Sequence, residues 1–197
     1  YHKYGHIPHK LMEVCKKAAE IAASGEKVVI FCSFLWNIKT MQEQLLKHNV
    51  SEGEVLKIDG SIPKDDEEDI QYNREKIIKA FKEKPNYKIL IATPPSCSES
   101  VSLHINSRGE TVCKHAIYFD RTFNAGHYIQ SKDRIHRIGM KDDTEVTYWI
   151  FRSAYTAEDG SESETCYIDD WTHNRLNRKE ERMLRALGDD LRPVDLN

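Results

Sequence analysis

Three long apolar runs constrain the fold of this chain more than any other feature; helical patterns lie between the first two, and an irregular stretch at 94–114 separates the last two. The runs are residues 27–34 (KVVIFCSF), 87–93 (YKILIAT) and 115–120 (HAIYFD). Strands that are apolar on both faces are typical of parallel sheets covered by helices on both sides. We therefore predict an α/β fold with three layers and a mostly parallel central sheet.

The remaining segments complete an alternation of strands and helices. Strands are also predicted at 54–59 and 144–151, the second near a sheet edge because its apolar residues alternate. Helices are predicted at 10–24, at 37–48 with Asn37 as N-cap, from the acidic run at 64 to residue 84, at 126–139 and at 167–187. Parallel sheets bind ligands beyond the carboxyl ends of their strands. The segments that follow Thr93 and Asp120 are therefore expected on one rim.

Composition limits the classes of function. The chain has 197 residues, 39% hydrophobic and 31% charged, with a net charge of −3. Nucleic-acid binding would therefore depend on a local basic patch. The five cysteines are odd in number and lack a CxxC pair, and the histidines are scattered, so we expect neither a disulfide framework nor a metal site. We expect no membrane span and no signal peptide, and a cytoplasmic location, or a nuclear one in a eukaryote.

The helix predicted at 126–139 carries the strongest candidate site. At helical spacing, Gln130, Arg134 and Arg137 fall within one narrow arc. A separate arc holds the apolar side chains Tyr128, Ile135 and Ile138. Two guanidinium groups one turn apart have the geometry that grips phosphate oxygens. Spacing alone favours a solvated helix face with an ion pair from Asp133 to Arg137, so a phosphate site depends on the surrounding motifs.

These motifs resemble those of superfamily 2 helicases, and in particular of the Swi/Snf-like DNA translocases. The segment QSKDRIHRIG, 130–139, resembles motif VI. In chain order, the segments at 27–34, 58–63, 89–104, 117–130 and 167–180 resemble motif IV, the DGS segment, motif V, the turn leading into motif VI and the C-terminal brace helix. The ordered set, which runs from residue 10 to residue 179, is more specific than any single motif.

The resemblance implies the second RecA-like lobe of a two-lobe motor. On this interpretation residues 1–9 are an N-terminal extension, 10–155 form the helicase C-terminal domain, and 156–197 form a linker and the brace helix. The chain contains no GxxxxGK[ST] phosphate loop and no DExx box on a strand. We therefore expect ATP and Mg²⁺ to be bound mainly by a first RecA-like lobe that lies outside this sequence.

The resemblance also implies roles at the nucleotide. Arg137 is the expected arginine finger, and Arg134 supports the same phosphates. Gln130 and Glu99 are expected at the nucleotide, and Asp133 is expected to orient an arginine, although a local ion pair explains Asp133 nearly as well.

Contacts to the nucleic-acid backbone are implied for Thr93, Ser98, Ser100, Ser102, Ser33 and Ser61. In motif V, Ser98 and Ser100 replace two glycines of the family pattern, and serine adopts a positive φ less readily than glycine. For Ser33 and Ser61 a turn or cap role is equally compatible with the sequence. The cations of the last helix are interpreted mainly as a solvated face, with DNA contact as the alternative. They are Arg175, Arg178, Lys179, Arg182 and Arg185.

These features predict a lobe of an ATP-dependent translocase of double-stranded DNA that is inactive as an ATPase on its own. Its expected partners are the first lobe and subunits of a remodelling, repair or restriction/defence complex. Two alternatives stay open: a degenerate binding module without motor activity, favoured by the serine-substituted loop, and an RNA helicase lobe.

Overall fold

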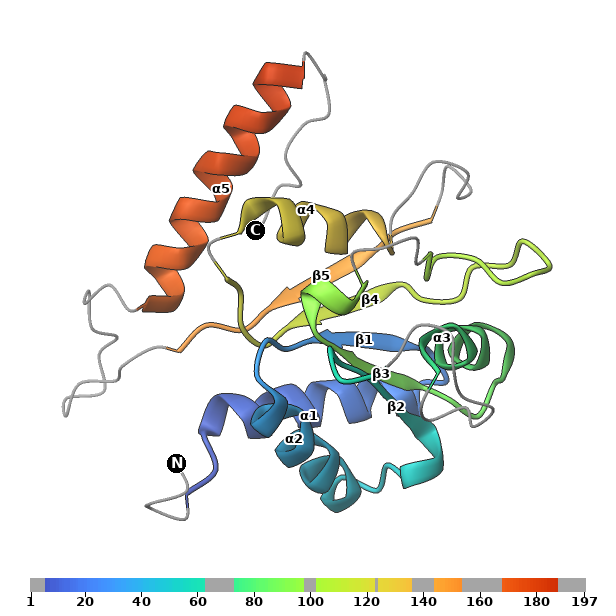
Figure 1. Ribbon diagram of the computed structural model, residues 1–197. Helices are drawn as coiled ribbons and strands as arrows, with labels where there is room; N and C mark the ends of the chain where they lie inside the picture. Colours follow the sequence, from blue (N-terminus) through green and yellow to red (C-terminus); the bar gives the residue numbers. More distant parts are fainter. Residues whose placement is uncertain are drawn as a thin grey trace.

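A computed structural model describes residues 6–62, 73–97, 102–122, 124–135, 144–153 and 168–187. Its centre is a five-stranded sheet in the order β2-β3-β1-β4-β5, with every pair parallel (Figure 1). The strands are β1 (Val28–Phe31), β2 (Val55–Ile58), β3 (Ile89–Ala92), β4 (His115–Tyr118) and β5 (Thr147–Ile150). The predicted parallel α/β fold is confirmed, and β5 lies at a sheet edge as its alternation predicts.

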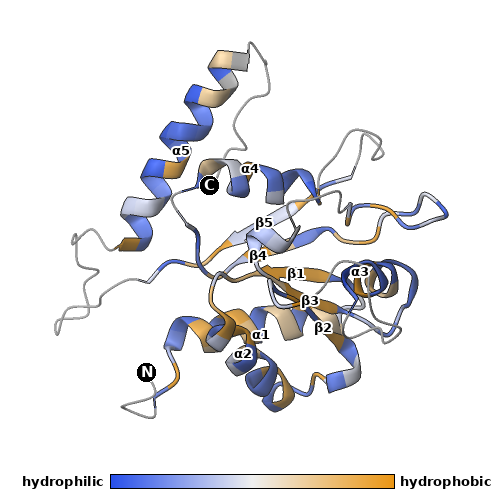
Figure 2. Cartoon of the chain, viewed as in Figure 1, coloured by the Kyte–Doolittle hydropathy of each residue, from blue (hydrophilic) through white to orange (hydrophobic). Residues whose placement is uncertain are grey.

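Two helices cover one face of the sheet. Helix α1 (His9–Ala23) and helix α2 (Leu35–Lys47) pack on each other and on the sheet (Figure 1). Their apolar sides form one core with the side chains of Val28, Ile30 and Ile91. Every residue of β1 and β3 is buried, because helices cover both sides of these central strands. Figure 2 shows these strands as the most hydrophobic part of the fold.

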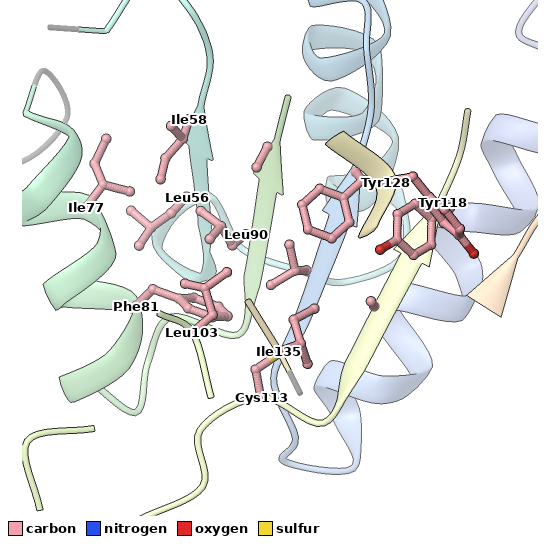
Figure 3. Packing of buried hydrophobic residues seen from close by; sticks show 14 of the residues in the cluster. Leu56, Ile58, Ile77, Phe81, Leu90, Leu103, Cys113, Tyr118, Tyr128 and Ile135 are labelled. Carbon is pink, nitrogen blue, oxygen red and sulfur yellow. The ribbon is translucent and has the colours of Figure 1, made fainter. Parts of the chain in front are cut away.

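The opposite face is covered by helix α3 (Arg74–Glu83) and helix α4 (Ala125–Asp133). They close a second core around Leu90, Tyr118 and Phe81 (Figure 3). The buried thiol of Cys113 belongs to this core, and burial raises its pKa to about 12, so it stays protonated. Short 3₁₀ turns, η1 (Glu52–Glu54) and η3 (Pro94–Cys97), precede β2 and follow β3.

Helix α5 (Ile168–Leu187) lies against α4 and extends away from the sheet (Figure 1). Leu176 is fully buried at this contact, and Lys132 of α4 pairs with Glu180 at 2.7 Å. Near its start, Asp169 accepts from Lys10 Nζ at 2.8 Å and from the backbone N–H of Ser153 at 2.7 Å. Polar contacts thus tie α5 to α4, to α1 and to the end of β5.

Three details differ from the prediction. Helix α2 begins at Leu35 with Phe34 as N-cap, so Asn37 lies inside the helix, and its side chain reaches the Cys32 thiol. Asn73 is an extended N-cap whose side chain accepts from the Lys76 N–H at 3.0 Å. A continuous helix from 64 to 84 is therefore wrong at Asn73, and the acidic run itself lies outside the described residues.

The third difference concerns the apolar side of α5. Ile168, Trp171 and Met183 are 66%, 44% and 41% exposed, although their spacing predicts burial. The helix meets the rest of the fold along a narrow strip that is partly polar, which leaves these side chains uncovered. Within the described part of the chain, no helix is long and apolar enough to cross a membrane. The same residues bring together no group of three His, Cys, Asp or Glu side chains that suits a metal ion.

Candidate nucleotide and nucleic-acid interface

The carboxyl ends of the five strands meet on one rim because all strands run the same way. In the register, Phe31 pairs with Ala92 and Tyr118, Ile58 pairs with Ala92, and Tyr118 pairs with Ile150. The segments that follow these positions carry most of the predicted site residues. The alternation of strands and helices therefore gathers residues from distant parts of the sequence on one surface.

The turn after β3 is held by hydroxyl groups. The Thr93 N–H donates to the Ile58 carbonyl at 3.0 Å, which continues the β2–β3 pairing by one step. The Thr93 hydroxyl donates to Ser96 Oγ at 2.7 Å, and Ser96 Oγ lies 3.1 Å from the same Ile58 carbonyl. Both side chains are buried. The Thr93 hydroxyl therefore shapes the turn, and the predicted contact with a nucleic-acid backbone stays a prediction.

Asp120 organises the rim between β1 and β4. Its carboxylate accepts from the Ser33 N–H at 2.9 Å and lies 3.7 Å from Cys32 Sγ. Burial raises the pKa of Asp120, and its hydrogen bonds with Ser33 partly offset that effect. The Ser33 hydroxyl oxygen is buried without a hydrogen-bond partner among the described residues. Asp120 is not among the predicted site residues. An acidic residue placed directly after a buried strand was the available signal.

Ser61 follows β2 in a turn closed by Asp59. The Asp59 carboxylate accepts from the Ser61 N–H at 2.9 Å and also from the Ser61 hydroxyl. Asp59 is buried, whereas Ser61 is exposed. The structure thus gives Ser61 the turn role that the sequence allowed, while leaving its side chain at the surface.

Helix α4 separates a buried side from a polar side, as its spacing predicts. Tyr128 and Ile135 are buried, and the Tyr128 ring packs edge-on against Tyr118 at 5.2 Å (Figure 3). Gln130 and Asp133 are exposed. The helix ends earlier than predicted, at Asp133, with Arg134 as its C-cap.

Arg134 lies at the junction of two predicted motifs. Its carbonyl oxygen accepts from the Leu103 N–H at 2.8 Å, which joins the end of the motif V segment to the end of α4. Ser102, one residue earlier, lies 2.6 Å from His104 Nδ1 through its hydroxyl. Leu103 and Ile135 belong to the same core cluster (Figure 3). The structure therefore joins the segment that carries Ser102 to the end of α4 through Leu103 and Arg134.

Arg134 is the predicted motif VI arginine that lies within the described residues. Its Nε is buried, while the residue as a whole is half-buried beside the exposed Gln130 and Asp133. A guanidinium held in this way offers a fixed set of donors to a phosphate. The predicted residues Arg137, Ser98, Glu99 and Ser100 lie outside the described residues.

Comparison with known proteins assigns the family. Residues 9–139 match the model of the helicase conserved C-terminal domain. The chain belongs to this family. The matched range contains α1 to α4, four of the five strands and the rim described above, and it ends at the last residue of the motif VI segment.

Curated relatives of this helicase C-terminal domain include Swi/Snf proteins. The chain is 25% identical over 137 residues to a SWI/SNF-related matrix-associated actin-dependent regulator of chromatin subfamily A-like protein 1 homolog of Caenorhabditis elegans. It is 28% identical over 137 residues to the ATP-dependent helicase fft1 of Schizosaccharomyces pombe. Each match covers 70% of this chain but only 17% and 12% of these relatives.

Solved structures show the same fold. The C-terminal part of the Fun30 ATPase domain matches 92% of this chain and 58% of its own length, with a TM-score of 0.55 and 21% identity. T4 UvsW matches 88% of this chain and 32% of its own length, with a TM-score of 0.57 and 12% identity. The predicted resemblance to the second lobe of a Swi/Snf-like superfamily 2 helicase is confirmed.

Proposed function

We propose that this chain is the second motor lobe of an ATP-dependent translocase of double-stranded DNA. In this role the rim completes a nucleotide site with the arginines at and after the end of α4, and it forms part of a DNA-backbone track with the segment after β3. Membership of the helicase C-terminal family supports the proposal, as do relatives whose names include an ATP-dependent helicase and a regulator of chromatin.

At the nucleotide, a first lobe holds ATP and Mg²⁺, and this chain supplies charge from the opposite side. Arg137 stabilises the negative charge that spreads over the phosphoryl oxygens in the transition state. Arg134 supports the same phosphates, Gln130 and Glu99 contact the nucleotide, and Asp133 orients an arginine. The half-buried guanidinium of Arg134 beside the exposed Gln130 is the described geometry that favours this assignment.

On the nucleic-acid side, hydroxyl groups at the rim contact the DNA backbone, which accepts hydrogen bonds through its phosphate oxygens. The proposed contacts are Ser33, Ser61, Thr93, Ser98, Ser100 and Ser102. Of these, the exposed Ser61 and the half-buried Ser102 have side chains that reach the surface in the described structure.

The observation that carries the proposal is the 2.8 Å hydrogen bond from Leu103 to Arg134. It connects the segment expected at the DNA to the arginine expected at the phosphates through the backbone. A motor needs such a connection, because a change at the nucleotide must move the segment that holds the nucleic acid.

The test uses the full-length protein with both lobes present. Arg137→Ala is expected to lower DNA-stimulated ATP hydrolysis by about a thousandfold or more, because an arginine finger contributes a factor of this size. Duplex affinity is expected to stay unchanged. Arg108→Ala, at an exposed residue next to Gly109, is the matched control and should turn over ATP normally. Normal turnover in the Arg137→Ala protein would refute the assignment.

The same assay separates the alternatives. Stimulation by duplex DNA well above stimulation by single strands or RNA supports the translocase, whereas stimulation by RNA alone identifies an RNA helicase. A full-length protein that binds nucleic acid and hydrolyses no ATP is the binding module that Ser98 and Ser100 suggest. The 197-residue chain on its own is expected to hydrolyse no ATP.

A further inference from the structure

Four arginines and a tryptophan form one stripe along α5. Trp171, Arg175, Arg178, Arg182 and Arg185 follow one another at helical spacings of three or four residues. At 3.6 residues per turn they fall within an arc of about 80°. All five are exposed. We call these five residues the arginine stripe.

The arginine stripe faces away from the core. Thr172, Leu176 and Glu180, which lie on the other side of α5, make the contact with the fold: the first two are buried, and Glu180 pairs with Lys132 of α4. These contacts fix the rotation of α5 about its own axis. The stripe is therefore held on the surface in one orientation.

Like charges follow one another within the stripe. Arginines three or four residues apart on a helix repel by a few tenths of a kcal/mol for each pair, and a solvated helix relieves this repulsion with interspersed acidic residues. The nearest acidic residue, Glu181, lies about 40° outside the arc of the stripe. Although its spacing would allow contact with Arg178 or Arg185, no carboxylate forms an ion pair with Arg178, Arg182 or Arg185 among the described residues. An anionic partner bound along the stripe would attract each arginine and so offset the repulsion between them.

A second basic surface of the chain differs from the arginine stripe, because its cations have partners within the chain. Lysines surround a hollow of about 430 Å³ near the amino-terminal ends of the strands. There, Lys27 donates to the carbonyl oxygen of Lys84 at 2.8 Å, Lys88 donates to Gly25 at 3.0 Å, and Arg108 pairs with Glu110 at 3.0 Å. Those cations have partners within the chain, and the last three arginines of the stripe have none among the described residues.

We propose that the arginine stripe binds the phosphate backbone of duplex DNA outside the rim. From Arg175 to Arg185 the helix rises about 15 Å, the length of four to five base pairs at about 3.4 Å each. Guanidinium forks bind phosphate oxygens in pairs, which favours arginine over lysine for this role. At one end, the Arg175 guanidinium lies 5.1 Å from the Trp171 ring centre and is held against it.

The inference rests on the proposed function, because a DNA translocase offers the stripe its ligand. It adds a binding surface on α5, beyond residues 9–139 that match the helicase family model. Because Lys132 and Glu180 join α5 to α4, DNA on the stripe has a fixed position relative to Arg134.

The test measures binding of the 197-residue chain to a fluorescein-labelled duplex of about 30 base pairs over a series of salt concentrations. The stripe variant replaces all four arginines with glutamine, which has a similar helix propensity, so circular dichroism should show the helix retained. The charge-matched control replaces four exposed lysines on α1, α2 and α3 with glutamine: Lys16, Lys39, Lys47 and Lys79.

The stripe variant is expected to bind about tenfold or more weakly, and its slope of log affinity against log salt should fall by about 3 to 4, since each phosphate contact contributes about 0.9. The control should change both values much less. Equal effects of the two variants, or no binding by the wild-type chain, would overturn the stripe. Competition by polyglutamate as effective as that by unlabelled duplex would instead identify an acidic protein surface as the partner.

The proposed DNA site on the stripe and the proposed motor function can be refuted independently. If the stripe variant binds duplex DNA as well as the wild-type chain does, the ATPase result for Arg137→Ala is unaffected. Normal ATP turnover in Arg137→Ala, together with a normal stripe result, would remove the motor assignment and keep the DNA site.

Discussion

The backbone N–H of Leu103 donates to the carbonyl oxygen of Arg134 at 2.8 Å, across 31 positions of sequence. Leu103 follows the segment expected at the nucleic acid, and Arg134 ends the helix expected at the nucleotide. Both neighbouring side chains, Leu103 and Ile135, are fully buried in the same core cluster. A main-chain hydrogen bond and apolar packing thus hold the segment at Leu103 and the end of α4 in a fixed position relative to each other.

Leu103→Ala is expected to lower the free energy of unfolding by about 2–4 kcal/mol, because it leaves a cavity at a fully buried site. Leu46→Ala is the control, since Leu46 is 45% exposed on α2 and should cost about 1 kcal/mol or less. Urea unfolding monitored by circular dichroism measures both. Equal losses would show that Leu103 does not anchor the rim.

Glu180→Gln is expected to weaken the docking of α5 by about 1–2 kcal/mol, because it leaves the partly buried Lys132 ammonium without its carboxylate. Glu181→Gln removes the same charge from the next, exposed position and should have little effect. Hydrogen exchange of the α5 amides reports the docking. Faster exchange in both variants alike would argue against the pair.

Stability should fall as the pH drops below about 6.5, in part because of His173. Burial lowers the pKa of His173, and the positive charges of Arg121 and Arg152 lower it further. The Arg121 guanidinium donates to His173 Nδ1 at 2.9 Å, which requires that nitrogen to be unprotonated. The stabilising contact is therefore complete above the unfolded pKa and is lost as the pH falls from there through the lower folded value.

His173→Gln isolates this effect, since the amide oxygen can still accept from Arg121 and does not titrate. Urea unfolding of both proteins between pH 7.5 and 5.5 should show a smaller loss of stability in the variant. Parallel curves for the two proteins would exclude His173 as a source of the pH dependence. Because the two proteins differ only at residue 173, the difference between their curves reports on this side chain.

Thr93→Val should destabilise the fold by about 1–2 kcal/mol, because it removes a buried hydroxyl that donates to Ser96. Thr122→Val is the comparison on the same rim, and since Thr122 is exposed just after β4 it should cost less than about 0.5 kcal/mol. Thermal unfolding decides between them. A stable Thr93→Val protein would mean that the hydroxyl is not needed to shape the turn and is available for the predicted DNA contact.

Periodicity predicted the parallel sheet, the helices that follow β1, β2 and β4, and the edge position of β5, because burial on one or two faces leaves a repeating pattern in the sequence. The two sides of α4 were predicted for the same reason. The ends of helices were predicted less well. Asn37 and Asn73 are both good N-cap residues, and only the second is used as one.

Contacts between distant residues could not be predicted. The Asp120 carboxylate and the Ser33 N–H are separated by 87 positions, and their hydrogen bond depends on the pairing of β1 with β4. The exposure of Trp171 could not be predicted either, because it depends on how α5 packs against the rest of the fold. The helix docks along a narrow strip, and this leaves exposed some apolar positions whose spacing predicts burial. The roles of Arg137 and the serines at 98 and 100 depend on the resemblance, and they stay predictions.

Asp169 gives α5 a mechanical anchor. Its carboxylate accepts from the Lys10 ammonium at the start of α1 and from the Ser153 N–H just after β5. The beginning of α5 is therefore joined to the first helix and to the last strand of the α/β core. A force applied along α5 would be shared between these two contacts at its base and the Lys132–Glu180 pair with α4. If DNA pulls on the helix, as the proposed stripe implies, part of the load would pass into α1 and the sheet edge, and only the remainder into α4, at whose end Arg134 lies.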